Sequence, residues 1–316
     1  MSFPLVSIVL CSYNGEKYLR EQLDSLLNQT YSPLEIIIRD DCSTDETYNI
    51  LLEYQQKKQH IQVHQNIKNI GFNGNFETAV LQSKGDFIAI CDQDDIWLPE
   101  KIEKLVNSIG ENWLIFSNSE LIDEEGTSLN KRLIRPLNIV NLDYRAIVLE
   151  NFVSGHTTLF RKEFLMYILP FPTTGYYDWW MGFVALYHKK LIYLDLVLTK
   201  YRIHAASVIN AQLNGASEQQ IKNINHQSLL IQLSHFTSYL KNEKDNLIID
   251  HINNIYRKAG GYNTGWSILF MHISYNSFFP FEKRRKLWST TRYKFVANFI
   301  QNLSANKAAA HLNINE

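Results

Sequence analysis

Cysteine is scarce in this sequence, and its pattern argues against both disulfides and zinc. The chain has 316 residues and only three cysteines, Cys11, Cys42 and Cys91. Because the count is odd and shows no tight pairing pattern, we predict no disulfide framework and a reducing compartment. No Cys-x-x-Cys pair or Cys/His cluster has the spacing of a zinc site.

The sequence also lacks an excess of charge of either sign and any long hydrophobic run. Lys and Arg total 31 against 32 Asp and Glu, a net charge of −1, so no global positive field favours a nucleic-acid partner. No stretch approaches the roughly 18 apolar residues that span a bilayer. The N-terminus has neither the basic nor the apolar region of a signal peptide. We therefore expect a cytoplasmic protein.

Short apolar runs alternate with helical periodicity over the first hundred residues. The predicted strands are 5–10, 35–38, 61–64 and 86–91, and the predicted helices are 16–28, 43–57, 75–83 and 99–107. Ser43 begins a capping-box pattern, and Pro99 suits a first helical turn. This alternation predicts an α/β fold with a mostly parallel central sheet flanked by helices. Ligands then bind beyond the carboxyl ends of the strands.

The rest of the chain divides near residue 210. Strand-like runs occupy 113–116, 157–160 and 191–198, and 179–187 suits a helix. Helical spacing continues in Leu229, Leu230, Leu233, Phe236 and Leu240. We predict a catalytic domain over 1–210, with halves of about 1–105 and 106–210, and a C-terminal helical region over 211–316.

Three carboxylates, Asp92, Asp94 and Asp95, follow the fourth predicted strand. Their mutual repulsion is offset most simply by a divalent cation, and Mn²⁺ and Mg²⁺ favour carboxylate oxygens. The alternative is a solvated turn in which Asp95 caps the next helix.

Two further acidic segments and one basic segment contain candidate functional residues. Asp40 and Asp41 follow the second strand, where they suit either an Asx-turn or contacts to a nucleotide. Asp178 has two aromatic residues on each side, and apolar surroundings raise a carboxylate pKa and favour a general base; the alternative is a helix N-cap. Arg202 suits phosphate, and His204 suits a metal or phosphate unless it is structural.

Taken in order, these motifs resemble the family 2 glycosyltransferases with the GT-A fold. The matching segments are VSIVLCSYN (6–14), LLNQTY (26–31), IIRDDCSTDET (37–47), NIG (69–71) with Asn75, GDFIA (85–89) and DQDDIWLPEK (92–101). A sparser block, SGHTTLFR (154–161), YDWW (177–180) and YRIH (201–204), is most similar to the bacterial branch with rhamnosyltransferases of surface polysaccharide synthesis. The resemblance covers about residues 5–208. Cys11 and Cys42 depart from the family's usual residues, Thr or another small residue and Gly or Asn.

The resemblance implies a role for each matching residue. Asp178 would be the general base, and Trp179 and Trp180 would line the acceptor side. The implied donor contacts are Tyr13, Asp40, Asp41, Asn75, Asp92 and Arg202. The implied metal ligands are Asp92, Asp94 and His204, with Mn²⁺ or Mg²⁺ as the cation.

The implied reaction is inverting, metal-dependent transfer of a sugar from a nucleotide-diphosphate donor to a saccharide or lipid-linked acceptor. dTDP-rhamnose is one candidate donor, and a UDP-hexose or UDP-N-acetylhexosamine is the alternative. A nucleotidyltransferase would require a Gly- and Lys/Arg-rich phosphate loop, which segment 12–15 lacks. A carbohydrate-binding protein without catalysis would not need both a metal motif and a separate base.

Aromatic and basic residues are interleaved in segment 278–300. This mixture predicts docking on an anionic membrane surface, which would make the protein peripheral at the inner face of the cell membrane. The alternative is an ordinary helix with a solvated basic face.

Overall fold

The computed structural model describes residues 3–135, 137–204, 218–240, 249–250 and 253–254. The chain divides into two compact units. The first consists of residues 1–140 and 151–204, and the second of 141–150 and 205–316. Segment 141–150 thus belongs to the second unit, although the sequence suggested no break there.

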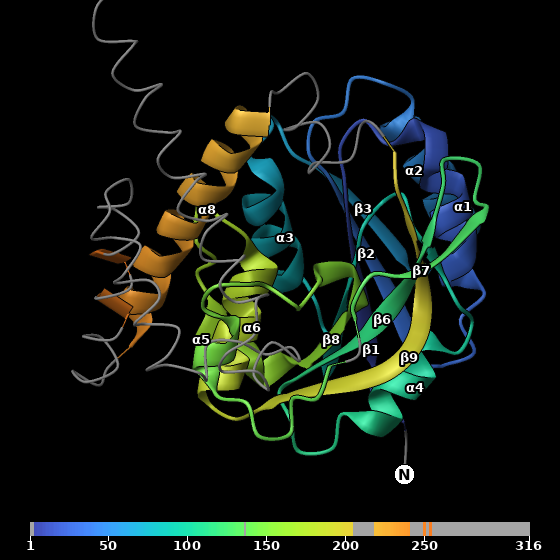
Figure 1. Ribbon diagram of the computed structural model, residues 1–316. Helices are drawn as coiled ribbons and strands as arrows, with labels where there is room; N and C mark the ends of the chain where they lie inside the picture. Colours follow the sequence, from blue (N-terminus) through green and yellow to red (C-terminus); the bar gives the residue numbers. More distant parts are fainter. Residues whose placement is uncertain (1–2, 136, 205–217, 241–248, 251–252, 255–316) are drawn as a thin grey trace, which may run out of the picture. The chain divides into compact units, whose positions relative to one another are not determined.

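A nine-stranded sheet forms the centre of the first unit (Figure 1). Its strands are β1 (Val6–Ser12), β2 (Leu34–Asp40), β3 (Ile61–Gln65), β4 (Phe87–Cys91), β5 (Ile96–Trp97), β6 (Leu114–Ile122), β7 (Ser128–Arg132), β8 (Thr158–Arg161) and β9 (Leu191–Arg202). Their order is β3-β2-β1-β4-β8-β6-β9-β5, and β7 pairs with β6 off this path. Strands β3, β2, β1 and β4 are parallel, as are β6 and β9. Strand β8 runs antiparallel between β4 and β6.

Helices cover both faces of the parallel half. The α-helices of this unit are α1 (Glu16–Leu27), α2 (Thr47–Lys57), α3 (Gly71–Leu81), α4 (Lys101–Ser108), α5 (Leu165–Ile168) and α6 (Tyr177–Tyr187). Short 3₁₀ turns occur at η2 (Gly155–Thr157) and η3 (Lys162–Phe164). Helices α1 and α2 lie on one side of the sheet and α3 on the other (Figure 1). The α/β fold predicted from the sequence is confirmed.

Burial on both faces explains why the first strand is continuously apolar. Ile8 and Leu10 of β1 join the core that contains Leu19 and Leu23 of α1. Val9 is also fully buried, although alternate strand residues point to opposite faces. A parallel strand covered on both sides needs such a run rather than an alternating pattern.

Two local predictions and one alternative were wrong. Helix α2 has Glu46 as its N-cap, because the Ser43 side chain instead donates to Asp40. Helix α4 begins after Pro99, with Glu100 as its N-cap. Asp95 is fully buried and does not cap α4 as the alternative supposed.

The second unit contains the 3₁₀ turn η1 (Tyr144–Ile147) and the long helix α8 (Glu218–Tyr239). Leu233, Phe236 and Leu240 are buried, in agreement with their helical spacing. Among the described residues, no helix combines the length and apolarity that crossing a bilayer requires. The predicted membrane-docking segment 278–300 lies outside the described residues.

Candidate active site

The carboxyl ends of β1, β2 and β4 meet at one edge of the sheet. Ser12 at the end of β1 pairs with Asp40 at the end of β2, and Leu10 pairs with Cys91 at the end of β4. The residues that follow these strands therefore gather at this edge, as the sheet rule predicted.

Asp40 is a fully buried carboxylate that organises the loop after β2. It accepts hydrogen bonds from the hydroxyls of Ser12 and Ser43, at 3.0 and 2.5 Å, from the Ser43 N–H at 2.9 Å, and from the Gln65 amide at 3.0 Å. Cys42 in this loop has a φ of 64°, which explains why Gly or Asn is more usual here.

Asp41 joins this loop to the start of α3. Its Oδ1 accepts from the Asn66 amide at 2.7 Å and the Ile70 N–H at 2.9 Å, while its Oδ2 accepts from the Gly71 N–H at 2.9 Å. Asn75 accepts from the Asn66 amide at 2.9 Å and donates to a backbone carbonyl of β2. A carboxylate oxygen can accept two hydrogen bonds, so Oδ2 has capacity for a donor besides the Gly71 N–H.

Gln93, which lies between Asp92 and Asp94, connects this segment to Tyr13. Its Oε1 accepts from the Tyr13 N–H at 2.8 Å, and its Nε2 donates to the Tyr13 carbonyl at 3.0 Å. A Cβ atom at Gly15 would lie 2.2 Å from the same Oε1, so the close approach requires glycine. The Tyr13 side chain remains 47% exposed and accessible to a ligand.

Asp94 and His204 form a pair suited to a cation. The His204 Nε2 lies 2.8 Å from the Asp94 Oδ2, and the two side chains are 8% and 19% exposed. A carboxylate and an imidazole this close together fit Mn²⁺ or Mg²⁺, which would take its remaining ligands from phosphate oxygens or water.

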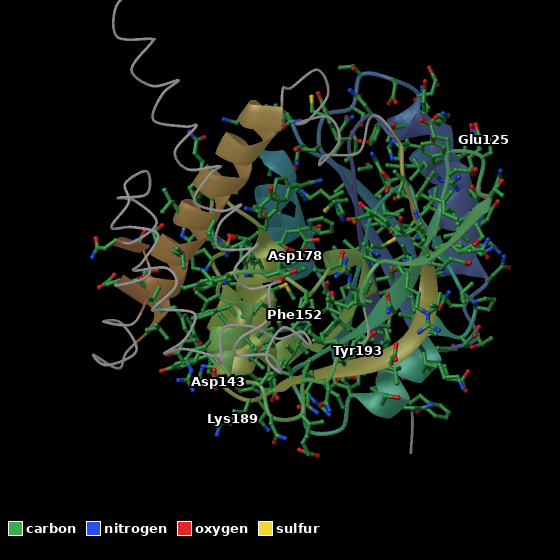
Figure 2. The ribbon with its side chains drawn as sticks, in the orientation of Figure 1. Glu125, Asp143, Phe152, Asp178, Lys189 and Tyr193 are labelled. Carbon is green, nitrogen blue, oxygen red and sulfur yellow. The ribbon has the colours of Figure 1, made fainter. Side chains whose placement is uncertain are left out.

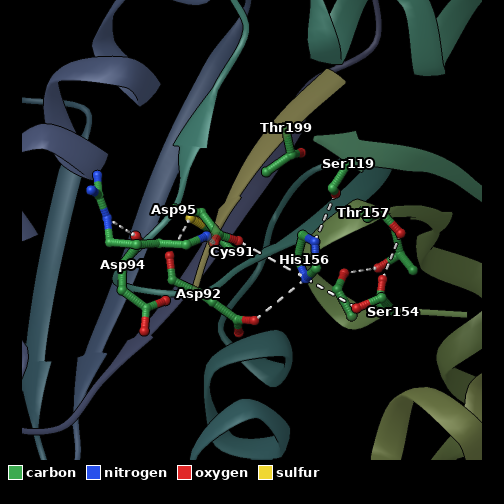
Figure 3. A network of polar contacts seen from close by, with 12 residues as sticks. Cys91, Asp92, Asp94, Asp95, Ser119, Ser154, His156, Thr157 and Thr199 are labelled. Carbon is green, nitrogen blue, oxygen red and sulfur yellow. Dashed lines mark hydrogen bonds and ion pairs between the residues drawn. The ribbon is translucent and has the colours of Figure 1, made fainter. Parts of the chain in front are cut away.

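Asp92, Asp95 and His156 form a second group whose ligand atoms lie within 4.8 Å of one another. His156 Nδ1 lies 3.7 Å from Asp92 and 3.9 Å from Asp95 (Figure 3). The same ring is held by Ser119 at Nε2 and Ser154 at Nδ1, at 2.9 and 3.0 Å. Burial raises the pKa of Asp92 and Asp95, because it disfavours their charged forms. Repulsion by the neighbouring Asp94 carboxylate raises the pKa of both further.

Lys101 is fully buried and interacts electrostatically with Asp92 and Asp95 of the acidic turn, which consists of residues 92–95. Its ammonium donates to the His156 carbonyl at 2.5 Å and to the Thr199 hydroxyl at 2.8 Å, and lies 3.5 Å from the centre of the Trp97 ring. Burial lowers its pKa to about 7. A resident positive charge thus offsets part of the repulsion that the sequence alone attributed to a bound metal.

Arg202 is also buried, and its guanidinium faces the protein. It donates to the Asp94 carbonyl at 3.0 Å and to the Glu124 carbonyl at 2.8 Å, and it pairs with Glu21. Its own N–H donates to Asp95 Oδ1 at 3.2 Å. These contacts differ from the expected phosphate contact.

Asp178 lies in the first turn of α6 (Figure 2), where Tyr176 rather than Asp178 is the N-cap. Its Oδ1 accepts from the Trp179 N–H at 2.6 Å and from the Asn151 amide at 3.2 Å, and its Oδ2 accepts from the Gly155 N–H at 3.2 Å. Burial raises its pKa from 3.8 to about 6, although these bonds act in the opposite direction. A carboxyl with this pKa is ionised at neutral pH yet basic enough to accept a proton.

The two tryptophans after Asp178 are both buried. The Trp180 indole donates to the Ile168 carbonyl at 2.9 Å, so its ring packs between α5 and α6. This position favours a packing role for Trp180. An acceptor contact by Trp179 stays a prediction.

The residues that connect Asp178 to Asp92 were not predicted from the sequence. Gly155 contacts Asp178, and the next residue, His156, contacts Asp92. The signal was present in the SGHTTLFR segment, which matched the family without a role for any residue. Asn151 and Lys101 gave no signal, because an isolated polar side chain reveals neither its burial nor its partners.

The described geometry combines the hydrogen-bonded carboxylates Asp40 and Asp41, the Asp94–His204 pair and a separate carboxylate of raised pKa, Asp178. Gly155 and His156 are consecutive, so Asp178 and Asp92 are joined by one short segment. Such a site can hold an anionic ligand through a cation and accept a proton beside it.

The family model for glycosyl transferase family 2 matches residues 7–169. Over 216 residues the chain is 33% identical to an uncharacterized glycosyltransferase of Rickettsia felis, which covers 64% of this chain and 35% of that relative. Over 158 residues it is 33% identical to a putative teichuronic acid biosynthesis glycosyltransferase of Bacillus subtilis, which covers 49% of this chain and 61% of that relative. The chain therefore spans about a third to three fifths of these relatives.

Two solved structures have the same fold. S. aureus TarS in complex with UDP-GlcNAc gives a TM-score of 0.57 at 17% identity, over 96% of this chain and 92% of that one. A mannosyltransferase from Pyrobaculum calidifontis, in complex with GDP-Man and Mn²⁺, gives a TM-score of 0.57 at 14% identity, over 99% and 88%. With the family match, the conclusion is plain: the chain belongs to glycosyltransferase family 2 and has the GT-A fold.

Proposed function

We propose that this chain transfers a sugar from a nucleoside-diphosphate donor to a hydroxyl of a saccharide or lipid-linked acceptor, with inversion at the anomeric carbon. One observation carries the proposal: the Gly155–His156 segment connects Asp178, whose pKa is raised to about 6, to Asp92 of the acidic turn. A proton acceptor therefore stands beside the group of residues suited to a diphosphate and its cation.

The donor nucleoside would bind at the edge formed by Tyr13, Asp40, Asp41 and Asn75. The half-exposed Tyr13 ring can stack on a base, and Asp41 Oδ2 can accept a further hydrogen bond from base or ribose. The two neighbours of known structure, with UDP-GlcNAc and GDP-Man bound, support the donor class without fixing the base.

Asp94 and His204, with Asp92, would hold the divalent cation. Their carboxylate and imidazole donors fit Mn²⁺ or Mg²⁺, and the Pyrobaculum mannosyltransferase contains Mn²⁺. The bound cation would act as a Lewis acid that neutralises charge on the departing diphosphate.

Asp178 would accept the proton of the acceptor hydroxyl. As the hydroxyl oxygen bonds to the anomeric carbon, the bond from that carbon to the diphosphate breaks, and its electron pair leaves with the diphosphate. Trp179, Gly155 and Asn151 donate to the carboxylate and orient it for this transfer. One displacement on the face opposite the leaving group inverts the anomeric configuration.

The acceptor would belong to a surface polysaccharide, as the function named for the Bacillus subtilis relative suggests. Within this class dTDP-rhamnose is our first candidate donor, from the resemblance of the second motif block. UDP-hexoses and UDP-N-acetylhexosamines are the alternatives.

A donor panel tests the function. The chain is mixed with Mn²⁺ and, separately, dTDP-rhamnose, UDP-glucose, UDP-galactose, UDP-GlcNAc and GDP-mannose, and thermal stability and release of nucleoside diphosphate are measured. We expect one donor class to stabilise the chain and to be turned over, with an inverted product by NMR. Binding without turnover would indicate a carbohydrate-binding protein, and pyrophosphate release from a nucleoside triphosphate would indicate a nucleotidyltransferase. A product with retained configuration would contradict the proposed displacement.

A further inference from the structure

Arg202 is the last residue of β9 and lies two residues before His204 in the sequence, a position that suggested a phosphate contact. We propose instead that Arg202 is a positioning residue, which holds the Asp94–Asp95 turn in the shape that binds the cation. This inference rests on the proposed function, because it assigns a task within the same site.

The guanidinium is directed at the backbone of two turns. Its Nε donates to the Asp94 carbonyl at 3.0 Å, and its Nη1 donates to the Glu124 carbonyl at 2.8 Å and the Asp123 carbonyl at 3.4 Å. Its Nη2 pairs with the Glu21 carboxylate of α1. One side chain thus connects α1, the turn after β6 and the acidic turn.

Most N–H donors of this guanidinium already have protein partners and are not free to bind a phosphate. Four of its five N–H groups are used by these partners. The side chain is 1% exposed, and its Cζ lies 4.6 Å from the centre of the Tyr18 ring. Bidentate phosphate binding requires two adjacent free N–H groups, and this arrangement does not offer them.

The same residue is linked to both carboxylates of the turn. Its backbone N–H donates to Asp95 Oδ1 at 3.2 Å, while its side chain fixes the Asp94 carbonyl. Two residues further on, His204 lies 2.8 Å from Asp94 Oδ2. Arg202 therefore fixes both the backbone of one proposed metal ligand and the strand end that supplies the other.

Groups that orient metal ligands commonly change metal affinity by about 10- to 100-fold when they are mutated. Arg202 also supplies the positive charge that pairs with the Glu21 carboxylate. A lysine could supply the charge, but it cannot reach the three carbonyls and Glu21 together.

The test measures Mn²⁺ binding by electron paramagnetic resonance of the free ion, with no donor present. The variants are Arg202→Lys and Glu21→Gln, which removes the guanidinium's carboxylate partner and leaves Arg202 intact. The matched control is Glu53→Gln, which removes the half-exposed Arg20–Glu53 pair, also formed with α1. Circular dichroism checks the fold of each variant.

We expect Arg202→Lys to weaken Mn²⁺ binding by about 10- to 100-fold. Glu21→Gln should weaken it by a smaller factor, and Glu53→Gln should leave it unchanged. If Arg202→Lys does not fold, Glu21→Gln decides the matter, because it removes the carboxylate partner of the guanidinium and leaves Arg202 in place.

Wild-type affinity for Mn²⁺ in Glu21→Gln would overturn the inference, and so would wild-type affinity in a folded Arg202→Lys. In those cases loss of Mn²⁺ binding in Asp94→Ala would still support the proposed metal site. Failure of the wild-type chain to bind Mn²⁺ would overturn both the metal site and this inference.

Discussion

Replacement of Asp178 by Asn should remove most of the transfer activity and at the same time stabilise the folded chain at neutral pH. The activity falls because Asn cannot accept the hydroxyl proton. Removal of a positioned general base typically lowers turnover by about 10²- to 10⁴-fold. The stability rises because Asp178 is ionised at pH 7 in a partly buried position that disfavours its charge.

The size of the stabilisation follows from the pKa. Burial raises the pKa of Asp178 from 3.8 to about 6. At about 1.4 kcal/mol for each pKa unit, this shift corresponds to at most ~3 kcal/mol. The Asn amide would also face a backbone donor that now contacts a carboxylate oxygen, which costs about 1–3 kcal/mol. Partial contact of Asp178 with solvent reduces the first value further, so we expect a net gain of about 1 kcal/mol or less.

The pH dependence of stability separates the cost of burying the Asp178 charge from the cost of the lost hydrogen bond. The folded pKa lies above the unfolded one, so the favourable contribution of Asp178 is complete below about pH 4 and is lost as pH rises through about 6. The stability of Asp178→Asn relative to wild type should therefore grow between pH 4 and pH 7. The lost hydrogen bond shifts this difference by a similar amount at every pH.

The assay is urea unfolding of both chains from pH 4 to pH 8, together with kcat/KM over the same range. Wild-type kcat/KM should fall as pH drops through about 6. The control is Asp195→Asn, which changes a carboxylate that is 55% exposed and should show no such growth in stability. A pH-independent stability difference for Asp178→Asn, or turnover near the wild-type rate, would refute the assigned role.

Three further outcomes are expected. Asp94→Ala should abolish the rise in activity on addition of Mn²⁺, measured after EDTA treatment, and chelator-resistant wild-type activity would argue against the metal site. Lys101→Met should lower the melting temperature, because it leaves two buried acceptors unpaired at about 1–3 kcal/mol each, and an unchanged melting curve would contradict this. Gly15→Ala and Gln93→Ala should each raise the donor KM, and the double variant should be no worse than Gln93→Ala, because both changes break the same contact with Tyr13. Additive effects would show that the two act separately.

The parallel half of the fold could be predicted because its signals are local. Continuous apolar runs such as the one around Val9 require burial on both faces, and the helices between them show regular apolar spacing. The two-residue strand β5 and the polar strand β7 gave no such pattern. They form through pairing with β9 and β6, which no local window reveals.

The candidate site could be predicted as residue types at strand ends, but not as a network. The sequence placed Asp92, Asp94 and Asp178 correctly beyond strands or at a helix start. It could not show that Lys101 is a buried side chain near the acidic turn. Lys101 is held there by His156, 55 residues away in the sequence, and this contact depends on the packed sheet. For the same reason the inward direction of Arg202 became visible only in the structure.

The central claim is that a cation held at Asp94 binds a nucleoside diphosphate beside Asp178. The most direct measurement is calorimetric titration of UDP, GDP and dTDP into the wild-type chain, Asp178→Asn and Asp94→Ala, each with Mn²⁺ and with EDTA. We predict that at least one nucleotide binds the wild-type chain and Asp178→Asn with Mn²⁺, and that EDTA or Asp94→Ala greatly weakens this binding. Equal affinity with and without the cation, or in Asp94→Ala, would contradict the account.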